Sequence, residues 1–315
     1  MTSLPISVVV LTLNEERNIG DCLGSVVGWA NEVVVVDSGS GDRTVAIAES
    51  RGARVVGHPF DSHSSQWSWA LDCSGLQSPW VFGLDADQRA TPELVESLRR
   101  TFSESGPRNR AIVGFYVSRR QVFRGRWIMH GGYYPKYLLK LFRADAVYFD
   151  EHDLMDHHFY VRGETAKLAG DIIEDNANEQ AISFWVAKHN RYAALVAREE
   201  LARQASASAW PQSPALFRSP DQRVMWLKQR WYGLPLYIRP ALYFVYRYAL
   251  RRGFLDGKQG FIFHFMHAFW YRLLVDINLD EIRNRPGISR NEGLVPDESS
   301  TRRPSQPTLS DEALL

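Results

Sequence analysis

The run Ile6–Leu13 reads ISVVVLTL and constrains the fold more than any other stretch of this chain. An apolar, β-branched run of this length is typical of a strand buried on both faces, as in parallel sheets covered by helices. Further strands are predicted at Glu32–Val36, Ala53–Gly57 and Trp80–Leu84, and segments with helical spacing separate them. This alternation predicts an α/β fold: a Rossmann-like, mostly parallel sheet with helices on both faces.

Polar residues follow three of these predicted strands directly. Asn14 and Glu15 follow the first strand, Asp37 ends the second, and Asp85 and Asp87 follow the fourth. The carboxyl ends of parallel strands form the edge at which α/β sheets bind ligands. Each motif alone also has a structural explanation, because short polar residues shape turns and cap helices. An isolated Asp-x-Asp is more often a solvated turn than a cation site.

Composition limits the class of protein. The chain has 315 residues, of which 45% are hydrophobic and 23% charged, so it is globular and large enough for one or two domains. Its net charge of +1 gives no sign of a nucleic-acid partner. Cys22 and Cys73 cannot form a disulfide framework. Neither a signal peptide nor an uninterrupted apolar run of about 18 residues is recognisable, so we expect a cytoplasmic protein.

The sequence suggests four regions. Further strands are predicted at Ile112–Ser118, Lys136–Phe142 and Val147–Phe149, so the sheet domain is expected to span residues 1–160. Residues 161–222 are predicted to be a helical extension that completes the acceptor side, with a long helix at Ala181–Gln204. Residues 223–284 are predicted to form amphipathic helices. Residues 285–315, rich in Pro, Ser and charge, are predicted to be a disordered tail.

The segment Arg223–Arg272 differs in composition from the rest. It carries nine Lys or Arg residues and one Asp among many Trp, Tyr, Phe and Leu residues. Such a mixture is typical of helices that lie in a membrane interface and bind anionic lipid through their basic side chains. Arg239-Pro240 and Asp256-Gly257 interrupt the apolar pattern, which favours in-plane helices over a span. A soluble helical subdomain is the alternative.

An acidic and histidine-rich cluster occupies residues 150–158 and reads DEHDLMDHH. Carboxylates and imidazoles serve as general bases, and the alternation of Asp and His also suits several transition metals. A loop whose charges face solvent is the third explanation. The residue types alone leave these three possibilities open.

Taken in order, LTLNEE at residues 11–16, VDSGSGDRT at 36–44 and LDAD at 84–87 resemble the inverting family-2 glycosyltransferases, which have the GT-A fold. The resemblance covers the N-terminal third of the chain closely. It implies a nucleotide-sugar donor, expected to be a UDP-sugar, and Mg²⁺ or Mn²⁺ as cofactor. It assigns the metal to Asp85 and Asp87. The residues it implies for donor binding are Leu11, Asn14, Glu15, Asp37, Gly39, Asp85 and Arg143.

Inverting transfer requires a base that deprotonates the acceptor hydroxyl. Enzymes that build lipopolysaccharide cores and capsules have a short His/Asp–Glu motif in this region, and its nearest match here contains Asp156. We therefore expect Asp156 to be the base, with Asp153 and Glu151 as alternatives. The resemblance also implies a glycolipid or undecaprenyl-linked acceptor at the inner face of the cell membrane.

Two other functions are compatible with parts of the pattern. A sugar nucleotidyltransferase shares the sheet and the acidic pair, but it needs a Gly-rich, basic loop after the first strand, where this chain has Asn14-Glu15-Glu16-Arg17. A non-catalytic carbohydrate-binding or scaffold protein would not depend on the carboxylates. The sequence therefore favours the transferase.

Overall fold

The computed structural model describes residues 3–103, 111–155, 158–206 and 210–284. Asp156 and the predicted tail at 285–315 lie outside the described residues. Over the first hundred residues, strands and helices alternate as predicted. These elements are β1 (Leu4–Thr12), α1 (Ile19–Gly24), β2 (Ala30–Asp37), α2 (Thr44–Ser50), β3 (Arg54–Gly57), α3 (His63–Cys73), β4 (Trp80–Asp85), β5 (Gln88–Ala90) and α4 (Pro92–Phe102).

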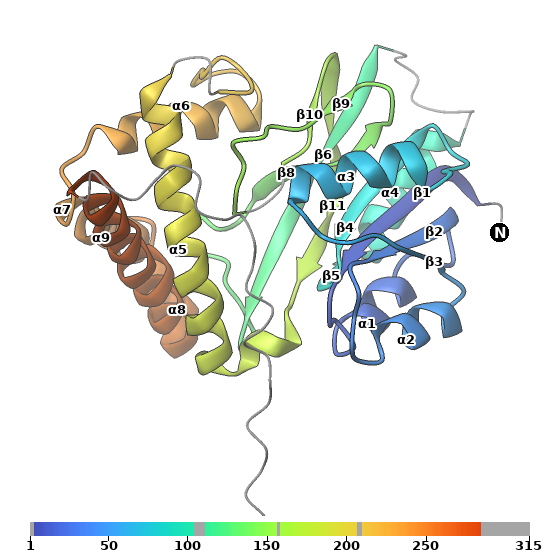
Figure 1. Ribbon diagram of the computed structural model, residues 1–315, viewed down its shortest axis with the longest axis horizontal. Helices are drawn as coiled ribbons and strands as arrows, with labels where there is room; N and C mark the ends of the chain where they lie inside the picture. The colour runs from blue at the N-terminus through green and yellow to red at the C-terminus, as the bar shows by residue number, and fades with distance from the viewer. Residues whose placement is uncertain (1–2, 104–110, 156–157, 207–209, 285–315) are drawn as a thin grey trace, which may run out of the picture.

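Most of the strands form one curved sheet (Figure 1), which has nine strands within the described residues. Its order is β3-β2-β1-β4-β8-β6-β11-β5, and β7 pairs with β6. The first four strands in this order are mutually parallel, β6 and β11 are parallel to each other, and β8 and β5 run antiparallel to their neighbours. The prediction of a mostly parallel α/β sheet is confirmed.

The second half of the sheet includes a strand, β11, that lies later in the chain than predicted. Its strands are β6 (Ile112–Phe123), β7 (Arg126–Trp127), β8 (Lys136–Arg143) and β11 (Glu164–Glu174), and a separate ribbon pairs β9 (Val147–Tyr148) with β10 (Tyr160–Val161). The expectation that the sheet ends near residue 160 was wrong. Strand β11 joins the main sheet between β6 and β5, so residues 164–174 are not part of a helical extension.

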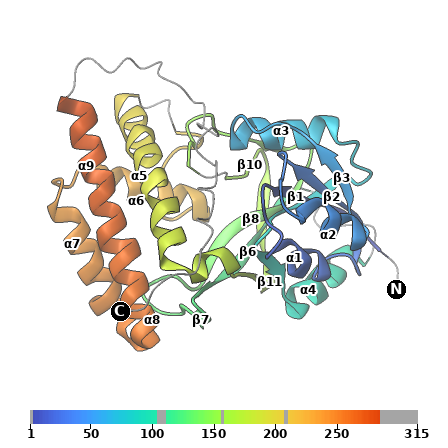
Figure 2. The ribbon, with the colours of Figure 1, turned by 60° about the horizontal axis from the view of Figure 1, so that its bottom comes forward.

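Helices cover both faces of the sheet (Figure 2). On one face, α1, α2 and α4 pack on a core that includes Val8, Val10 and Leu84. On the other face, α3 contributes Trp67 to a core with Val9. Alternate residues of β1 thus enter opposite cores, which explains why its sequence is apolar throughout.

A layer of helices lies beside the sheet and makes up the other half of the molecule (Figure 1). After the short 3₁₀ turn η1 (Ala177–Gln180), its α-helices are α5 (Ile182–Ala205), α6 (Pro220–Tyr232), α7 (Ile238–Val245), α8 (Gly257–His264) and α9 (Tyr271–Asn284). Two π turns, η3 (Tyr246–Leu250) and η5 (Phe265–Trp270), and one 3₁₀ turn, η4 (Gly253–Asp256), connect them. The predicted long helix is confirmed as α5.

Two buried ion-pair clusters hold this layer in place. Arg239 of α7 contacts Glu200 of α5 at 2.8 Å and Asp276 of α9 at 2.6 Å, and all three side chains are buried. Arg203 of α5 contacts Asp150 at 2.8 Å and Asp153 at 2.7 Å, in the loop that follows β9. The second cluster joins the helical layer to the sheet half of the protein.

Candidate active site

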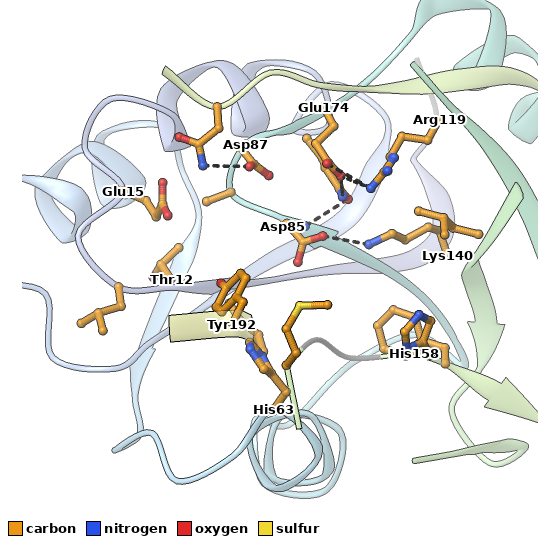
Figure 3. Close-up of a pocket in the computed structure, with 18 of the residues that line it drawn as sticks. Thr12, Glu15, His63, Asp85, Asp87, Arg119, Lys140, His158, Glu174 and Tyr192 are labelled. Carbon is orange, nitrogen blue, oxygen red and sulfur yellow. Dashed lines mark hydrogen bonds and ion pairs between the residues drawn. The ribbon is translucent and has the colours of Figure 1, made fainter. Parts of the chain in front are cut away.

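A cavity of about 410 Å³ opens at the carboxyl ends of β1 and β4 (Figure 3). Its wall combines Glu15 from the loop after β1, Asp85 and Asp87 from the end of β4, Lys140 from β8 and Lys188 from α5. The predicted ligand-binding edge of the sheet is therefore hollow, and the helical layer closes its far side.

Asp85 is paired with Lys140 at the centre of this cavity. The Lys140 ammonium lies 3.0 Å from Asp85 Oδ2, and the lysine side chain is almost fully buried. The register explains how it reaches: Phe115 of β6 faces Leu141, whereas Tyr116 faces Leu139, so Lys140 is the extra residue of a β-bulge. Bulges re-aim side chains beside active sites.

Asp87 lies beside Asp85 in a more acidic environment. Its Oδ2 accepts a hydrogen bond of 3.0 Å from the Asn176 amide. Burial in the cavity wall raises the pKa of Asp87 well above its usual range, and the nearby carboxylates of Glu174 and Asp85 raise it further. An added cation would relieve this repulsion, so the site suits a divalent metal.

A metal bound by Asp85 and Asp87 would need further ligands that the other described side chains of the site do not supply. Within the described part of the chain, no group of three or more Asp, Glu, His or Cys side chains is arranged to hold a metal ion. Glu174 is already paired with Arg119 at 2.8 Å (Figure 3). Asp85 and Asp87 therefore fit Mg²⁺ or Mn²⁺ if substrate oxygens complete the coordination, since hard cations prefer oxygen ligands.

The loops after β1 and β2 differ in what reaches the cavity. Leu11 and Glu15 line it, and burial raises the pKa of the Glu15 carboxyl, although a hydrogen bond from Asn18 opposes the shift. Asp37 instead accepts hydrogen bonds from the backbone amides of Gly39 and Ser40, at 3.0 and 2.8 Å. Asp37 shapes the loop, and neither Asp37 nor Gly39 belongs to the cavity wall.

Asn14 and Arg143 are also absent from the wall. Asn14 Oδ1 accepts a hydrogen bond of 2.9 Å from the Gly41 amide, so this side chain joins the loops after β1 and β2. The Arg143 guanidinium lies 2.9 Å from Asp145 at the protein surface. The prediction that Arg143 meets the donor is not supported by this position, since Lys140 supplies the cation at the cavity.

The predicted base candidates differ in accessibility. Asp153 is buried, accepts hydrogen bonds from Arg203 and Tyr160, and lies 3.2 Å from His158. Burial alone would raise the pKa of Asp153, but His158 and nearby cations outweigh it and hold this pKa below its usual value. Glu151 is exposed to solvent. Asp156 lies outside the described residues, so its place is untested.

The sequence did not identify several residues of the wall. Glu174 ends β11 and Asn176 follows two residues later, after the apolar pair Ile172-Ile173, which is the same strand-then-polar pattern that marked Asp85. Asp221 enters from the first turn of α6. No local motif indicates Asp221, because its place depends on how α6 packs against β6.

Comparisons with known proteins identify the family of this chain. Residues 7–164 match the family model described as Glycosyl transferase family 2, and the chain belongs to that family. It is 28% identical over 277 residues to the lipopolysaccharide core biosynthesis glycosyltransferase LpsC of Rhizobium meliloti, a match that covers 84% of this chain and 91% of the relative. The protein is a glycosyltransferase with a relative in lipopolysaccharide core synthesis.

Two further comparisons cover smaller parts. An uncharacterized glycosyltransferase of Rickettsia bellii is 39% identical over 98 residues, which are 31% of this chain and 33% of that protein. Glucosyl-3-phosphoglycerate synthase of Mycobacterium tuberculosis, solved in complex with Mn²⁺, UDP-glucose and phosphoglyceric acid, is 26% identical with a TM-score of 0.30. That match covers 39% of this chain and 45% of the synthase.

Proposed function

We propose that this glycosyltransferase moves a sugar, with inversion, from a UDP-sugar to a saccharide carried on a lipid. The observation that carries the proposal is the cavity in which Asp85, Asp87 and Glu15 converge at the ends of parallel strands, with Lys140 and Lys188 in the same wall. Acids at this edge suit a metal and a ribose, and cations suit a diphosphate.

Charges around the acidic pair are arranged for a leaving group. Burial lowers the pKa of Lys188, but the carboxylates of Glu179, at 2.8 Å, and Asp87 raise it by more. This pKa therefore lies above its ordinary value, and the ammonium stays charged. Lys140 provides a second cation. A bound Mg²⁺ or Mn²⁺ would supply Lewis-acid stabilisation of the departing diphosphate.

The reaction is a single displacement. The acceptor hydroxyl loses its proton to a protein base, its oxygen forms a bond to the anomeric carbon, and the carbon–oxygen bond to the diphosphate breaks. Family membership and the acidic loop after β1 favour this reaction over nucleotidyl transfer. A scaffold protein would need neither the partly buried carboxylate pair nor the cavity.

The test is nucleoside diphosphate release from a panel of UDP-sugars, with alkyl glycosides or water as acceptor. Wild-type protein should depend on Mg²⁺ or Mn²⁺, and Asp87→Asn should lose at least about 10²-fold in turnover. Asp145→Asn, an exposed carboxylate outside the cavity, is the matched control. Undiminished turnover in EDTA, or an active Asp87→Asn variant, would contradict the metal assignment.

We also propose that the protein binds peripherally to the cytoplasmic face of the cell membrane. Within the described chain, the helices lack the combination of length and apolar character required to span a membrane. The turn-and-helix surface from Ile238 to Phe265 nevertheless exposes large apolar side chains. These are Ile238, Leu242, Val245, Tyr246, Leu250, Phe254, Leu255, Phe261 and Phe265.

This surface, here called the α7–α8 face, combines apolar and basic character. Leu242 is 53% exposed and Leu250 is 72% exposed. Arg251, Arg252 and Lys258 are exposed beside them in the chain. Exposed apolar patches mark interaction sites, and flanking cations match an anionic lipid surface.

Vesicle co-sedimentation tests this proposal. Wild-type protein should sediment with phosphatidylglycerol vesicles more than with phosphatidylcholine vesicles, and less at high salt. Leu242→Glu with Leu250→Glu should abolish sedimentation without loss of folding, because both side chains are already exposed. Val27→Glu, an exposed position outside this face, is the control. Equal sedimentation of all three proteins would refute the α7–α8 face as the anchor.

A further inference from the structure

Asp221 is a carboxylate of the cavity wall that comes from a part of the chain far from the predicted base candidates. It sits in the first turn of α6, a helix fixed at its start by the capping box of Ser219 and Gln222. The same carboxylate also lines a smaller recess with His158 and Trp210. Asp221 therefore lies between the main cavity and a recess on the helical side.

The contacts of Asp221 fix one oxygen and leave the other available. Tyr116 Oη donates a hydrogen bond of 2.6 Å to Asp221 Oδ2. Among the residues that the structure describes, no hydrogen bond to Oδ1 is present. Asp153, by contrast, is occupied by Arg203, Tyr160 and His158.

Tyr116 also sets where Asp221 stands relative to the leaving-group site. In the sheet, Tyr116 of β6 faces Leu139 of β8, the residue next to the bulged Lys140 that holds Asp85. Tyr116, which contacts Asp221, and Lys140, which contacts Asp85, thus lie on adjacent paired strands. A sheet is the kind of rigid support that a displacement reaction requires.

The environment of Asp221 suits proton acceptance. Burial raises the pKa of its carboxyl above the ordinary value, while the Tyr116 hydrogen bond and the charge of His158 act in the opposite direction. A carboxylate made more basic in this way takes up a proton more readily near neutral pH. Glu174 lacks this freedom because it is paired with Arg119 and accepts a hydrogen bond from Gln88.

We propose that Asp221 is the general base of the transfer reaction. Its Oδ1 takes the proton of the acceptor hydroxyl as that oxygen bonds to the anomeric carbon, and the electron pair of the broken carbon–oxygen bond leaves with the diphosphate. This assignment rests on the proposed function. It places the catalytic residue on α6 instead of in the acidic cluster at 150–158.

The experiment compares Asp221→Asn with Asp156→Asn, the variant of the competing base candidate, and with Asp145→Asn, an exposed carboxylate outside the cavity. The asparagine keeps an oxygen for Tyr116, so folding should be retained and is checked by thermal melting. Diphosphate release should fall by about 10²- to 10⁴-fold in Asp221→Asn. The dissociation constant for UDP, measured by calorimetry with Mn²⁺, should stay within about twofold, because a base contacts the acceptor and not the nucleotide.

A second variant separates catalysis from a structural role. Tyr116→Phe removes the hydrogen bond that stabilises the Asp221 carboxylate, so the pKa of Asp221 should rise and the acidic limb of the pH–rate profile should move to higher pH. An Asp221→Asn variant with at least a third of wild-type turnover, or one that loses UDP binding in proportion, would overturn the assignment. Wild-type protein that binds UDP but releases no diphosphate from any donor would overturn the proposed function itself.

Discussion

Replacing Arg203 by Met tests whether the buried charges between α5 and the β9–β10 loop set the stability of the protein. Arg203 is 4% exposed and contacts Asp150, Asp153 and Glu199. Methionine fills much of the same volume without a charge. The substitution therefore removes the guanidinium and leaves carboxylates in a buried environment.

The loss of stability depends on which cations still contact the carboxylates after the substitution. Glu199 keeps Lys228 at 3.0 Å, and Asp150 keeps His152 at 3.1 Å. Breaking a buried pair costs about 3–5 kcal/mol. Because partners remain, we expect the lower end, a loss of about 3 kcal/mol in the free energy of unfolding at pH 7.5. That is a large part of the stability of an ordinary domain.

The pH dependence has a defined sign. In the wild-type protein the pKa of Asp153 is lowered, so its ionised form stabilises the fold above the unfolded pKa, and this contribution is lost as pH falls. In Arg203→Met this pKa should rise, so protonation removes the buried charge already in mild acid. The difference between variant and wild type should therefore be smaller at pH 5 than at pH 7.5.

Urea unfolding followed by tryptophan fluorescence, at both pH values, measures these differences. Arg100→Met is the matched control, because Arg100 pairs with Glu96 at 3.6 Å on the exposed side of α4 and should change stability by less than about 0.5 kcal/mol. A loss below about 1 kcal/mol at pH 7.5, or a loss that grows as pH falls, would refute the reasoning.

Two other substitutions probe the site. Gly83→Ala should destabilise the protein by about 1–3 kcal/mol in urea unfolding, because a Cβ there would lie 2.6 Å from the Phe159 ring; wild-type stability would show that the ring moves without cost. Lys140→Met should reduce diphosphate release by about 10²-fold, since it removes a cation beside the leaving group. Lys167→Met, exposed on β11, should remain active, and equal losses in the two lysine variants would argue against a specific role.

Much of the sheet side of the cavity follows from local sequence. β1, β2 and β4 are apolar because both faces are covered, and their polar ends mark the loops that carry Glu15 and Asp85. Parallel pairing then brings these ends to one edge without further information. The apolar strands with polar ends that are visible in the sequence are thus the same strands that bring Glu15 and Asp85 together in space.

The remainder of the site depends on long-range packing. β11 carries Lys167, Gly170 and Asp171 and is interrupted by a bulge, so its alternation is weak. The place of Lys140 depends on a bulge in the β6–β8 register. Asp221 is 105 residues from Tyr116 in the chain, and only the packing of α6 brings them together.

Strand β11 has a consequence for how the protein can be divided. The family match ends at residue 164, where this strand begins. Without β11 and the two residues that follow it, Arg119 would lose its partner Glu174, Asp87 would lose Asn176, and β6 would present an unpaired edge. The sheet half is thus not a detachable module, because β11 lies after the segment matched by the family model and directly before the helical layer. Exchanging the helical layer between relatives would preserve the contacts of Asp87 and Arg119 only if the crossover falls after Asn176.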